Sequence, residues 1–264
     1  MRTNPTWHAV FPCCGPPRED DHHRGAGAGQ RCHGQSGLHG FSFGELVFED
    51  CRIPAGNRLG EEGQGLDVAY SSSVLYGRPN LTAVALGIHR AIVEDTVRFC
   101  TQERVMYGKP LAQLPTVNDK LGRMQSQLMT ARPAAYHAVH LLDRGLPCDT
   151  ELINAKLVNT EYMLDSARTA MEIFAARGLQ ASYSIERYLR DAHHVYAPAG
   201  TSDIQRLRLG QAAIGAYGQQ WSVVLADKVS CNPPADVARR LGEPIRSTGH
   251  VGWLHRGATD QLAS

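Results

Sequence analysis

The chain has 264 residues, of which 42% are hydrophobic and 20% are charged, and its formal net charge at pH 7 is +1. A chain of this length can bury a substantial core, so a small scaffold that depends on disulfides for its stability is excluded. The near balance of 27 basic and 26 acidic side chains indicates no nucleic-acid partner, and no apolar run approaches the roughly 18 residues that span a bilayer. We therefore expect a globular protein that binds neither nucleic acid nor a membrane.

The seven cysteines are scattered and include no CxxC pair, and no secretory signal precedes them. This usage predicts a reducing, cytoplasmic setting. Two groups of side chains contain metal-ligand types, but neither has a recognised ligand spacing, and we predict no metal site. The first group is Cys13, Cys14, His22, His23, Cys32 and His33 near the start of the chain, and the second is His137, His140 and Asp143 on a predicted helix.

The first part of the chain divides into two segments of different composition. Residues 1–36 are rich in Gly, His, Pro and Cys, which do not build a regular apolar face, so we predict a low-complexity, disordered segment. Residues 45–54 then alternate apolar and polar side chains and stop at Pro54, which predicts one or two strands within residues 37–60. A glycine-rich connector follows over residues 59–65.

From residue 61 to about residue 225 the pattern is helical. Apolar side chains recur at spacings of three and four residues in four segments, which predicts four amphipathic helices. Pro79 is expected to lie in the first turn of the first helix or to kink it. The stripes consist of Leu81, Val84, Ala85, Ile88, Ile92 and Phe99; Leu121, Met124, Leu128, Ala131, Ala135, Val139 and Leu142; Ile153, Leu157, Leu164, Ala167, Met171 and Phe174; and Ile204, Leu207 and Ile214.

Four such helices with short connections predict a mainly α protein built as an antiparallel four-helix bundle. Residues 226–264 are polar and rich in Pro and Gly, and we expect a loose tail there.

The start of the fourth predicted helix carries the strongest local motif, Gly200-Thr201-Ser202-Asp203. Ser202 and Gln205 have the spacing of a capping box, which is the commoner explanation of such a motif. A hydroxyl-rich helix N-terminus preceded by a glycine also suits an anionic or electron-rich ring system. The residues alone leave both interpretations open.

Two further motifs are ambiguous when taken singly. Arg104 and Tyr107 precede a Gly/Pro break after the first long helix, where an arginine can bind a phosphate or interact with the helix dipole. Residues 186–191 mix charged and aromatic side chains, as a helix at a subunit boundary does, although a solvated helix face is commoner.

In this order, the segments resemble the C-terminal half of the acyl-CoA dehydrogenase family. The resemblance runs from about Gly37 to about residue 218. It rests on residues 45–54 with the connector, Arg78, the segment 102–110, the segment 186–191 and the segment 200–206. Residues 1–36 do not resemble the preceding domains of the family.

The resemblance implies the fold and the ligands of that family. It implies a helical bundle over residues 61–225, preceded by a remnant of the middle β domain at residues 37–60. It further implies FAD as cofactor, a CoA or carrier-protein thioester as substrate, an electron-transfer flavoprotein or another acceptor, and a homo- or hetero-oligomer. By the same resemblance, Arg104, Tyr107, Thr201, Ser202 and Asp203 bind FAD, and Arg78 and Gly200 contact substrate.

The same comparison reveals departures from the family pattern. The two positions at which the family carries its catalytic glutamate are Ala199 and Gly77, so we predict no catalytic residue. Pro115 stands near a position where a flavin-contacting glutamine is expected. Glu172 begins a segment that receives the ADP half of the cofactor in a neighbouring subunit, and a carboxylate there would repel a pyrophosphate. We therefore expect weak FAD binding.

These observations predict a FAD-dependent oxidoreductase that desaturates an acyl thioester between its α and β carbons, in a truncated or weakly active form. The alternative is a non-catalytic subunit that pairs with an active acyl-CoA dehydrogenase paralogue. A plain helical interaction module without flavin is the third hypothesis.

Overall fold

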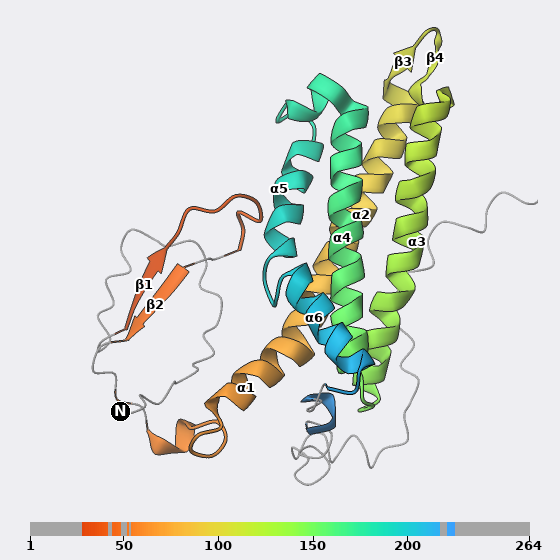
Figure 1. Cartoon of the computed structure of the whole chain (residues 1–264). Helices are drawn as coiled ribbons and strands as arrows, with labels where there is room; N and C mark the ends of the chain where they lie inside the picture. Colours follow the sequence, from red (N-terminus) through yellow and green to blue (C-terminus); the bar gives the residue numbers. More distant parts are fainter. Residues whose placement is uncertain (1–27, 42–43, 49–51, 53, 217–220, 225–264) are drawn as a thin grey trace, which may run out of the picture. The chain divides into compact units, whose positions relative to one another are not determined.

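The computed structural model describes residues 28–41, 44–48, 52, 54–216 and 221–224. Among these residues, no helix combines the length and the apolar composition that crossing a membrane requires. In chain order the elements are β1 (Ala28–Cys32), β2 (Gly44–Phe48), α1 (Gly65–Ser72), α2 (Arg78–Arg98), β3 (Val105–Met106), β4 (Lys109–Pro110), α3 (Pro115–Asp143), α4 (Asp149–Phe174), α5 (Ile185–Tyr196) and α6 (Ser202–Ala213), as Figure 1 shows.

The helices α2, α3, α4 and α5 form a four-helix bundle, which is the predicted architecture, and successive helices run in opposite directions (Figure 1). Helix α4 is the central element, because it packs against α2, α3, α5 and α6. Small side chains of α4, such as Ala155, Ala167 and Ala170, are almost fully buried and let neighbouring helices approach closely. Because every other helix of the bundle contacts α4, changes on α4 are felt throughout the core.

An aromatic cluster closes the bundle where α2 ends. Phe99 stacks on Phe174 with ring centroids 3.9 Å apart, and Tyr183 meets both rings edge-on at 5.9 and 5.6 Å. The Arg177 guanidinium lies 5.9 Å from the centroid of the Phe99 ring. The cluster joins the ends of α2 and α4 to the segment before α5.

A two-stranded hairpin, β3–β4, connects α2 to α3. Its two loop residues, Tyr107 and Gly108, have φ angles of 53° and 76°. Two successive positive φ angles match the right-handed twist of a tight hairpin, and glycine adopts this conformation without strain. The Tyr107 side chain is consequently held at the tip of the hairpin, 86% exposed.

Pro79 lies in the first turn of α2, where its missing N–H is tolerated, so the early-turn alternative is the one that the structure confirms. A π-helical segment, Ser73–Gly77, precedes it, and a second one, Phe99–Glu103, follows α2. Short 3-10 segments lie at Ala55–Asn57, Leu111–Gln113 and Ala175–Leu179.

Two sequence predictions differ from the structure. Residues Ala28–Cys32 form β1, which pairs antiparallel with β2, although disorder was predicted up to residue 36. This short strand forms because its backbone pairs with that of β2. Its own sequence, AGQRC, lacks the alternation of apolar residues that would predict a strand. Residues 1–27 and the predicted tail, 226–264, lie outside the described residues.

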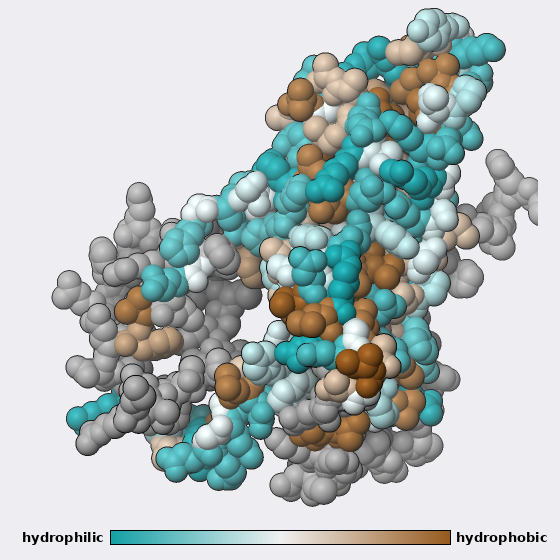
Figure 2. Space-filling model, viewed as in Figure 1, coloured by the Kyte–Doolittle hydropathy of each residue, from teal (hydrophilic) through white to brown (hydrophobic). Residues whose placement is uncertain are grey.

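The fourth helix of the bundle is also different from the predicted one. Helix α5 fills this position, with Ile185, Ala192 and Val195 buried, whereas Ile204, Leu207 and Ile214 of the predicted fourth stripe are exposed. The buried residues of α6 are Ser202 and Gln205. Hydrophobic side chains are visible on the surface around α6 in Figure 2. Helix α6 thus lies across α4 with polar side chains toward it.

Candidate functional site

The turn between α5 and α6, residues 197–201, has an unusual backbone. Ala199 and Gly200 both have positive φ angles, 55° and 95°. This conformation is strained for alanine and accessible to glycine. A Cβ atom added to Gly200 would lie 2.8 Å from Nε2 of Gln205, so the space beside Gly200 is already filled. Only glycine fits position 200 without displacing its neighbours.

Two buried side chains, Lys156 and Gln205, hydrogen-bond to this turn. Lys156 of α4 donates hydrogen bonds to the carbonyl oxygens of Tyr196 and Gly200, both at 2.8 Å. Gln205 of α6 donates from Nε2 to the carbonyl oxygens of Ala199 at 2.8 Å and Gly200 at 3.2 Å. The carbonyl groups of the turn therefore point into the protein.

The capping box predicted for Ser202 and Gln205 is wrong. Thr201 occupies the N-cap position, and no side chain caps the helix. Ser202 is one residue inside α6, and the Gln205 side chain reaches back to the turn instead of to the N-cap amide. The reason is the backbone: the positive φ angles before Thr201 turn two carbonyl groups toward Gln205 and engage its amide.

The two hydroxyl side chains of the motif, Thr201 and Ser202, differ in exposure. Ser202 is 1% exposed, and its Oγ has no hydrogen-bond partner within the described part of the chain. Thr201 and Asp203 are exposed. Buried hydroxyls are normally hydrogen-bonded, so a ligand or water at Ser202 would complete this position.

Arg78 lies at the same end of the bundle as this turn. It is buried in the first turn of α2, and its cation contributes to lowering the pKa of Lys156. Gly77 precedes it with helical φ and ψ angles. The structure thus brings Arg78, Gly77, Ala199, Gly200 and the hydroxyls to one region.

Arg104 and Tyr107 lie at the opposite end of the bundle, at the β3–β4 hairpin (Figure 1). The backbone N–H of Arg104 donates to the Phe99 carbonyl at 2.9 Å, and its carbonyl accepts from the Leu111 N–H at 2.8 Å. Its side chain is half-buried. Helix α2 separates Arg104 from Arg78, and at 1.5 Å per residue its 21 residues span about 30 Å.

The predicted cofactor residues therefore form two groups that one copy of the chain does not bring together. We call them the turn group, formed by Arg78 and residues 199–203, and the hairpin group, formed by Arg104 and Tyr107. A ligand shorter than about 30 Å can contact both groups only if the turn group and the hairpin group come from different copies or subunits.

Glu172, which was expected to repel a pyrophosphate, is paired. Its carboxylate accepts a 2.6 Å hydrogen bond from Nζ of Lys120 on α3. This hydrogen bond holds the pKa of the Glu172 carboxyl below its ordinary value. The carboxylate stays charged, but part of its field is compensated by the neighbouring cation.

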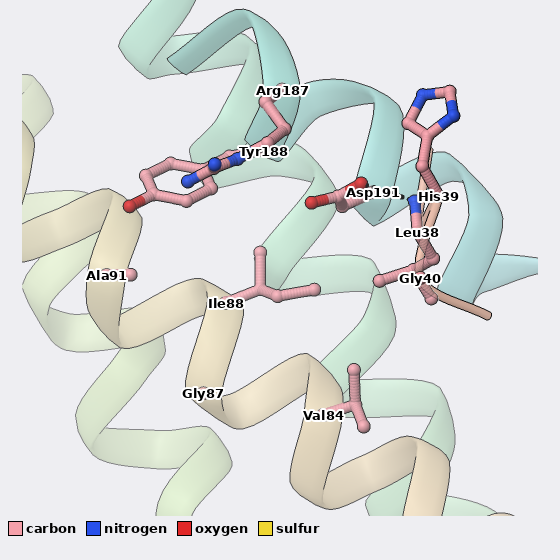
Figure 3. Close-up of a pocket in the computed structure, with 10 residues that line it drawn as sticks. All are labelled: Leu38, His39, Gly40, Val84, Gly87, Ile88, Ala91, Arg187, Tyr188 and Asp191. Atoms are coloured by element: carbon pink, nitrogen blue, oxygen red, sulfur yellow. Dashed lines mark hydrogen bonds between the residues drawn. The ribbon is translucent and has the colours of Figure 1, made fainter. Parts of the chain in front are cut away.

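A pocket of about 480 Å³ lies between α2, α5 and the segment before β2. Figure 3 shows its floor, which is one face of α2, with the side chains of α5 above it. None of the predicted site residues lines this pocket. It is lined by Leu38, His39, Gly40, Val84, Gly87, Ile88, Ala91, Arg187, Tyr188 and Asp191.

His137 and His140 are exposed on α3. Within the described ranges, no three His, Cys, Asp or Glu side chains lie close enough together to hold a metal ion. Cys13, Cys14, His22 and His23 of the other group lie outside the described residues.

Sequence reasoning missed Lys156 and assigned a different role to Gln205. A signal for Lys156 was present: it falls on the buried stripe of α4, between Ile153 and Thr160, where an apolar side chain is expected. A lysine at such a position is almost never fully buried unless its ammonium group has partners. The position alone does not indicate that the partners are carbonyl groups of a distant turn.

Comparison with known proteins identifies the class of protein to which this arrangement belongs. The family model for the C-terminal domain of acyl-CoA dehydrogenases matches residues 63–214, from the connector before α1 to the end of α6. The chain therefore belongs to the acyl-CoA dehydrogenase family.

Individual relatives agree with this assignment. An acyl-CoA dehydrogenase of Bacillus subtilis is 36% identical over 179 residues, which are 68% of this chain and 47% of that protein. An L-prolyl-(peptidyl-carrier protein) dehydrogenase of Pseudomonas fluorescens is 37% identical over 162 residues, 61% of this chain and 42% of that protein. The solved structure of butyryl-CoA dehydrogenase from Megasphaera elsdenii is similar with a TM-score of 0.69 and 33% identity, covering 71% of this chain and 49% of the other. The chain spans about half the length of the relatives it matches.

Proposed function

We propose that this chain is the helical half of a FAD-dependent oxidoreductase site for an acyl thioester. FAD would lie against the turn group of one chain and the hairpin group of another. The observation that carries this proposal is the separation of the two groups by the length of α2. The resemblance of residues 102–110 and 200–206 to flavin-contacting segments, drawn from the sequence, supports it. One cofactor would thus require at least two subunits, in a homo- or hetero-oligomer.

The residues present fit such a ligand at the turn group. The buried Oγ of Ser202 has no partner among the described residues, and Thr201 exposes a second hydroxyl beside it. The space beside Gly200 is filled by Gln205, so a planar ring would meet the exposed Thr201 rather than the glycine. When bound, FAD would supply the hydride acceptor for the β-carbon of the substrate. Ser202 and Thr201 would orient its ring.

The hairpin group would hold the other part of the cofactor. Arg104 can donate two parallel hydrogen bonds to a phosphate of the cofactor. The exposed Tyr107 ring at the hairpin tip can pack against the part of the cofactor beside that phosphate. The pairing of Glu172 with Lys120 reduces, without removing, the repulsion expected for a pyrophosphate. We therefore propose that FAD binds weakly.

The substrate would be a CoA or carrier-protein thioester. Relatives named for both kinds of carrier match this chain at similar identity, so the likeness alone does not distinguish them. Arg78 and Gly200 would lie beside the acyl group. An electron-transfer flavoprotein or another acceptor would reoxidise the flavin.

A non-catalytic subunit is a second candidate, and one observation favours it. By the resemblance drawn from the sequence, Ala199 and Gly77 stand where the family carries its base, and neither side chain can accept the α-proton. Losing a positioned general base typically lowers a rate by about 10² to 10⁴. In this alternative the chain would contribute its hairpin group to the flavin site of an active paralogue.

A titration of the purified chain with FAD, followed by anaerobic addition of butyryl-CoA, tests these alternatives. Bound flavin that is bleached by the thioester supports the catalytic form. Flavin that binds only when a family paralogue is co-expressed, and is lost in the Arg104→Ala variant, supports the non-catalytic subunit. No flavin binding in either preparation would overturn both. Lys109→Ala is a matched control, since it removes an exposed cation from the same hairpin.

A further inference from the structure

Lys156 is the most deeply buried cation of the described chain. It is 0% exposed, and its Nζ atom donates to two backbone carbonyls, Tyr196 O and Gly200 O, over 2.8 Å each. Its ammonium group also lies 5.8 Å from the centroid of the Tyr196 ring. Within the described part of the chain, the hydrogen-bond acceptors and the aromatic ring that Lys156 contacts thus belong to the end of α5 and the turn after it.

The two carbonyls that Lys156 binds are four residues apart. Tyr196 precedes the two strained residues of the turn, and Gly200 is the second of them. The residues with positive φ are Ala199 and Gly200, and they are held by hydrogen bonds from Lys156 of α4 and Gln205 of α6. Both side chains donate to the same Gly200 oxygen. A backbone conformation that costs free energy persists only where the surrounding contacts determine it, and these two side chains provide such contacts.

Burying an ammonium group carries a large desolvation cost, which a methionine or leucine at the same position would avoid. Helix α4 is otherwise lined with apolar or small neutral side chains at its buried positions near Lys156, such as Leu152, Ile153 and Thr160. The core therefore does not require a lysine for packing. What the lysine alone supplies is a donor that spans the distance from α4 to the turn.

We propose that Lys156 is a positioning residue that fixes the turn between α5 and α6 and thereby sets where the hydroxyls of Thr201 and Ser202 lie. That these hydroxyls face a flavin rests on the proposed function. The hold of Lys156 on the turn does not, because it is a property of the chain by itself.

The charge of Lys156 gives this contact a pH dependence. Burial lowers the pKa of Lys156 to about 8, with the Arg78 cation on α2 acting in the same direction and the Glu161 carboxylate on α4 opposing it. The groups that α5 and α6 present to Nζ are the Tyr196 ring and neutral backbone carbonyls. If the turn opens, Lys156 meets water and its pKa returns toward 10.5, so protonation favours opening. The turn is consequently held more firmly as pH rises from about 8 to 10.5.

Two measurements on the full chain, without FAD, test the proposal. Amide hydrogen exchange at neutral pH is compared for the native chain, Lys156→Met and the control Lys120→Met, which removes a partly exposed lysine of α3 that pairs with Glu172. Methionine keeps the length and packing of the side chain but donates no hydrogen bond. We expect Lys156→Met to raise exchange at least tenfold at the Gln205 amide, which donates to the Thr201 carbonyl, and at the next amides of α6, with α3 unaffected, and Lys120→Met to leave these amides unchanged. Equal protection of the turn in all three proteins would overturn the proposal.

The second measurement follows the backbone amide resonances of Gly200 and Thr201 in the native chain as a function of pH. We expect them to titrate with a midpoint near the lowered pKa of about 8, and this titration to be absent in Lys156→Met and retained in Lys120→Met. Resonances that stay constant up to pH 10.5 contradict this pH dependence of the turn. Should Lys156→Met fail to fold, the exchange comparison is made with Lys156→Leu, and equal protection of the turn in that variant overturns the proposal. A FAD titration of the same proteins separates the two ideas: loss of turn protection without any flavin binding supports the role of Lys156 and contradicts the proposed function.

Discussion

The backbone N–H of Leu38 donates a 2.6 Å hydrogen bond to Oδ1 of Asp191, a residue of α5 that is 153 positions further along the chain. Beside this bond, His39 contacts the Arg190 guanidinium at 2.7 Å. Gly37 is buried with a φ angle of 82°. The short segment before β2 is thus attached to α5 of the bundle by the contacts of Leu38 and His39.

Replacing Gly37 with alanine should detach this segment. The added Cβ would overlap the Arg190 carbonyl oxygen, which belongs to a helix backbone and has little freedom to move, and the positive φ angle adds strain. We expect a loss of about 2 kcal/mol or more in the free energy of unfolding, measured in urea. Gly34→Ala is the matched control, because a Cβ atom at Gly34 meets nothing within 4 Å. Equal effects of the two substitutions would contradict the docking of this segment.

The centre of the bundle contains a chain of polar contacts that should make the fold sensitive to acid. His89 of α2 lies 2.8 Å from the Ser166 hydroxyl, which donates to Oε1 of Gln127 at 3.1 Å. Nε2 of Gln127 in turn donates to Asp165 at 2.7 Å. Since Ser166 uses its proton toward Gln127, His89 must donate to Ser166 from Nε2, and its buried Nδ1 has no hydrogen-bond partner among the described residues.

Burial lowers the pKa of His89 from 6.5 to about 4, against the opposing effect of the Asp165 carboxylate. The unfolded chain therefore binds a proton that the folded chain does not, between these two values. The resulting stability is present above pH 6.5 and is lost as the pH falls toward 4, by about 3 kcal/mol in all.

Urea unfolding of the native chain and of His89→Gln at a series of pH values measures this contribution. Glutamine keeps a donor near the position of Nε2 but does not titrate, so its unfolding free energy should fall less steeply below pH 6.5. His137→Gln, which changes an exposed histidine on α3, should behave as the native chain does. A His89→Gln profile parallel to the native one would show that the imidazole is already protonated or solvated.

The aromatic cluster at the hairpin end yields a third prediction. Phe99 is 1% exposed and stacks on Phe174, so Phe99→Ala should lower the free energy of unfolding by about 3 to 5 kcal/mol through lost burial and a cavity. Val105→Ala, at an exposed position of β3, should change it by less than about 0.5 kcal/mol. If the two changes have similar effects on thermal or urea unfolding, the stacking contributes little.

The helices were predictable where a long apolar stripe faces the core, as in α2, α3 and α4. Met124, Leu128 and Ala131 are buried as their spacing indicated, whereas Val139 is exposed and Ala138 is buried instead. A stripe drawn at fixed spacing cannot follow the drift of a real helix past its neighbours over 29 residues. Helix α5 was recognised only as a charged, aromatic segment, because its polar residues outnumber its buried ones.

The candidate site was predictable in composition but not in its internal contacts. The motif of Gly200, Thr201 and Ser202 indicated a helix N-terminus, which the structure confirms. The partners of the turn depend on the positive φ of Ala199, a residue that rarely adopts it, and on a lysine 44 residues away on another helix. Both are consequences of tertiary packing, which local propensity and spacing do not contain.

Restoring a carboxylate tests whether the turn group lacks only its base. Gly77 has a helical backbone, and a Cβ atom there would meet Ser73 Oγ at 3.8 Å, an ordinary contact. Ala199 already carries a Cβ atom at its positive φ, so Glu adds no backbone strain. We expect Gly77→Glu or Ala199→Glu to raise the rate of flavin bleaching by butyryl-CoA about 10² to 10⁴-fold over the unmodified chain, in whichever preparation binds FAD.

The amide variants Gly77→Gln and Ala199→Gln are the controls, because glutamine has the shape of glutamate but cannot accept the α-proton. A gain in one glutamate variant, absent in its glutamine counterpart, would identify which of the two positions faces the substrate. Independently of flavin, Gly77→Glu should stabilise the chain by up to about 1 kcal/mol in urea, since glycine is a poor helix residue. If neither glutamate raises the rate although both variants fold and bind FAD, the turn group is not the place where the α-proton is removed.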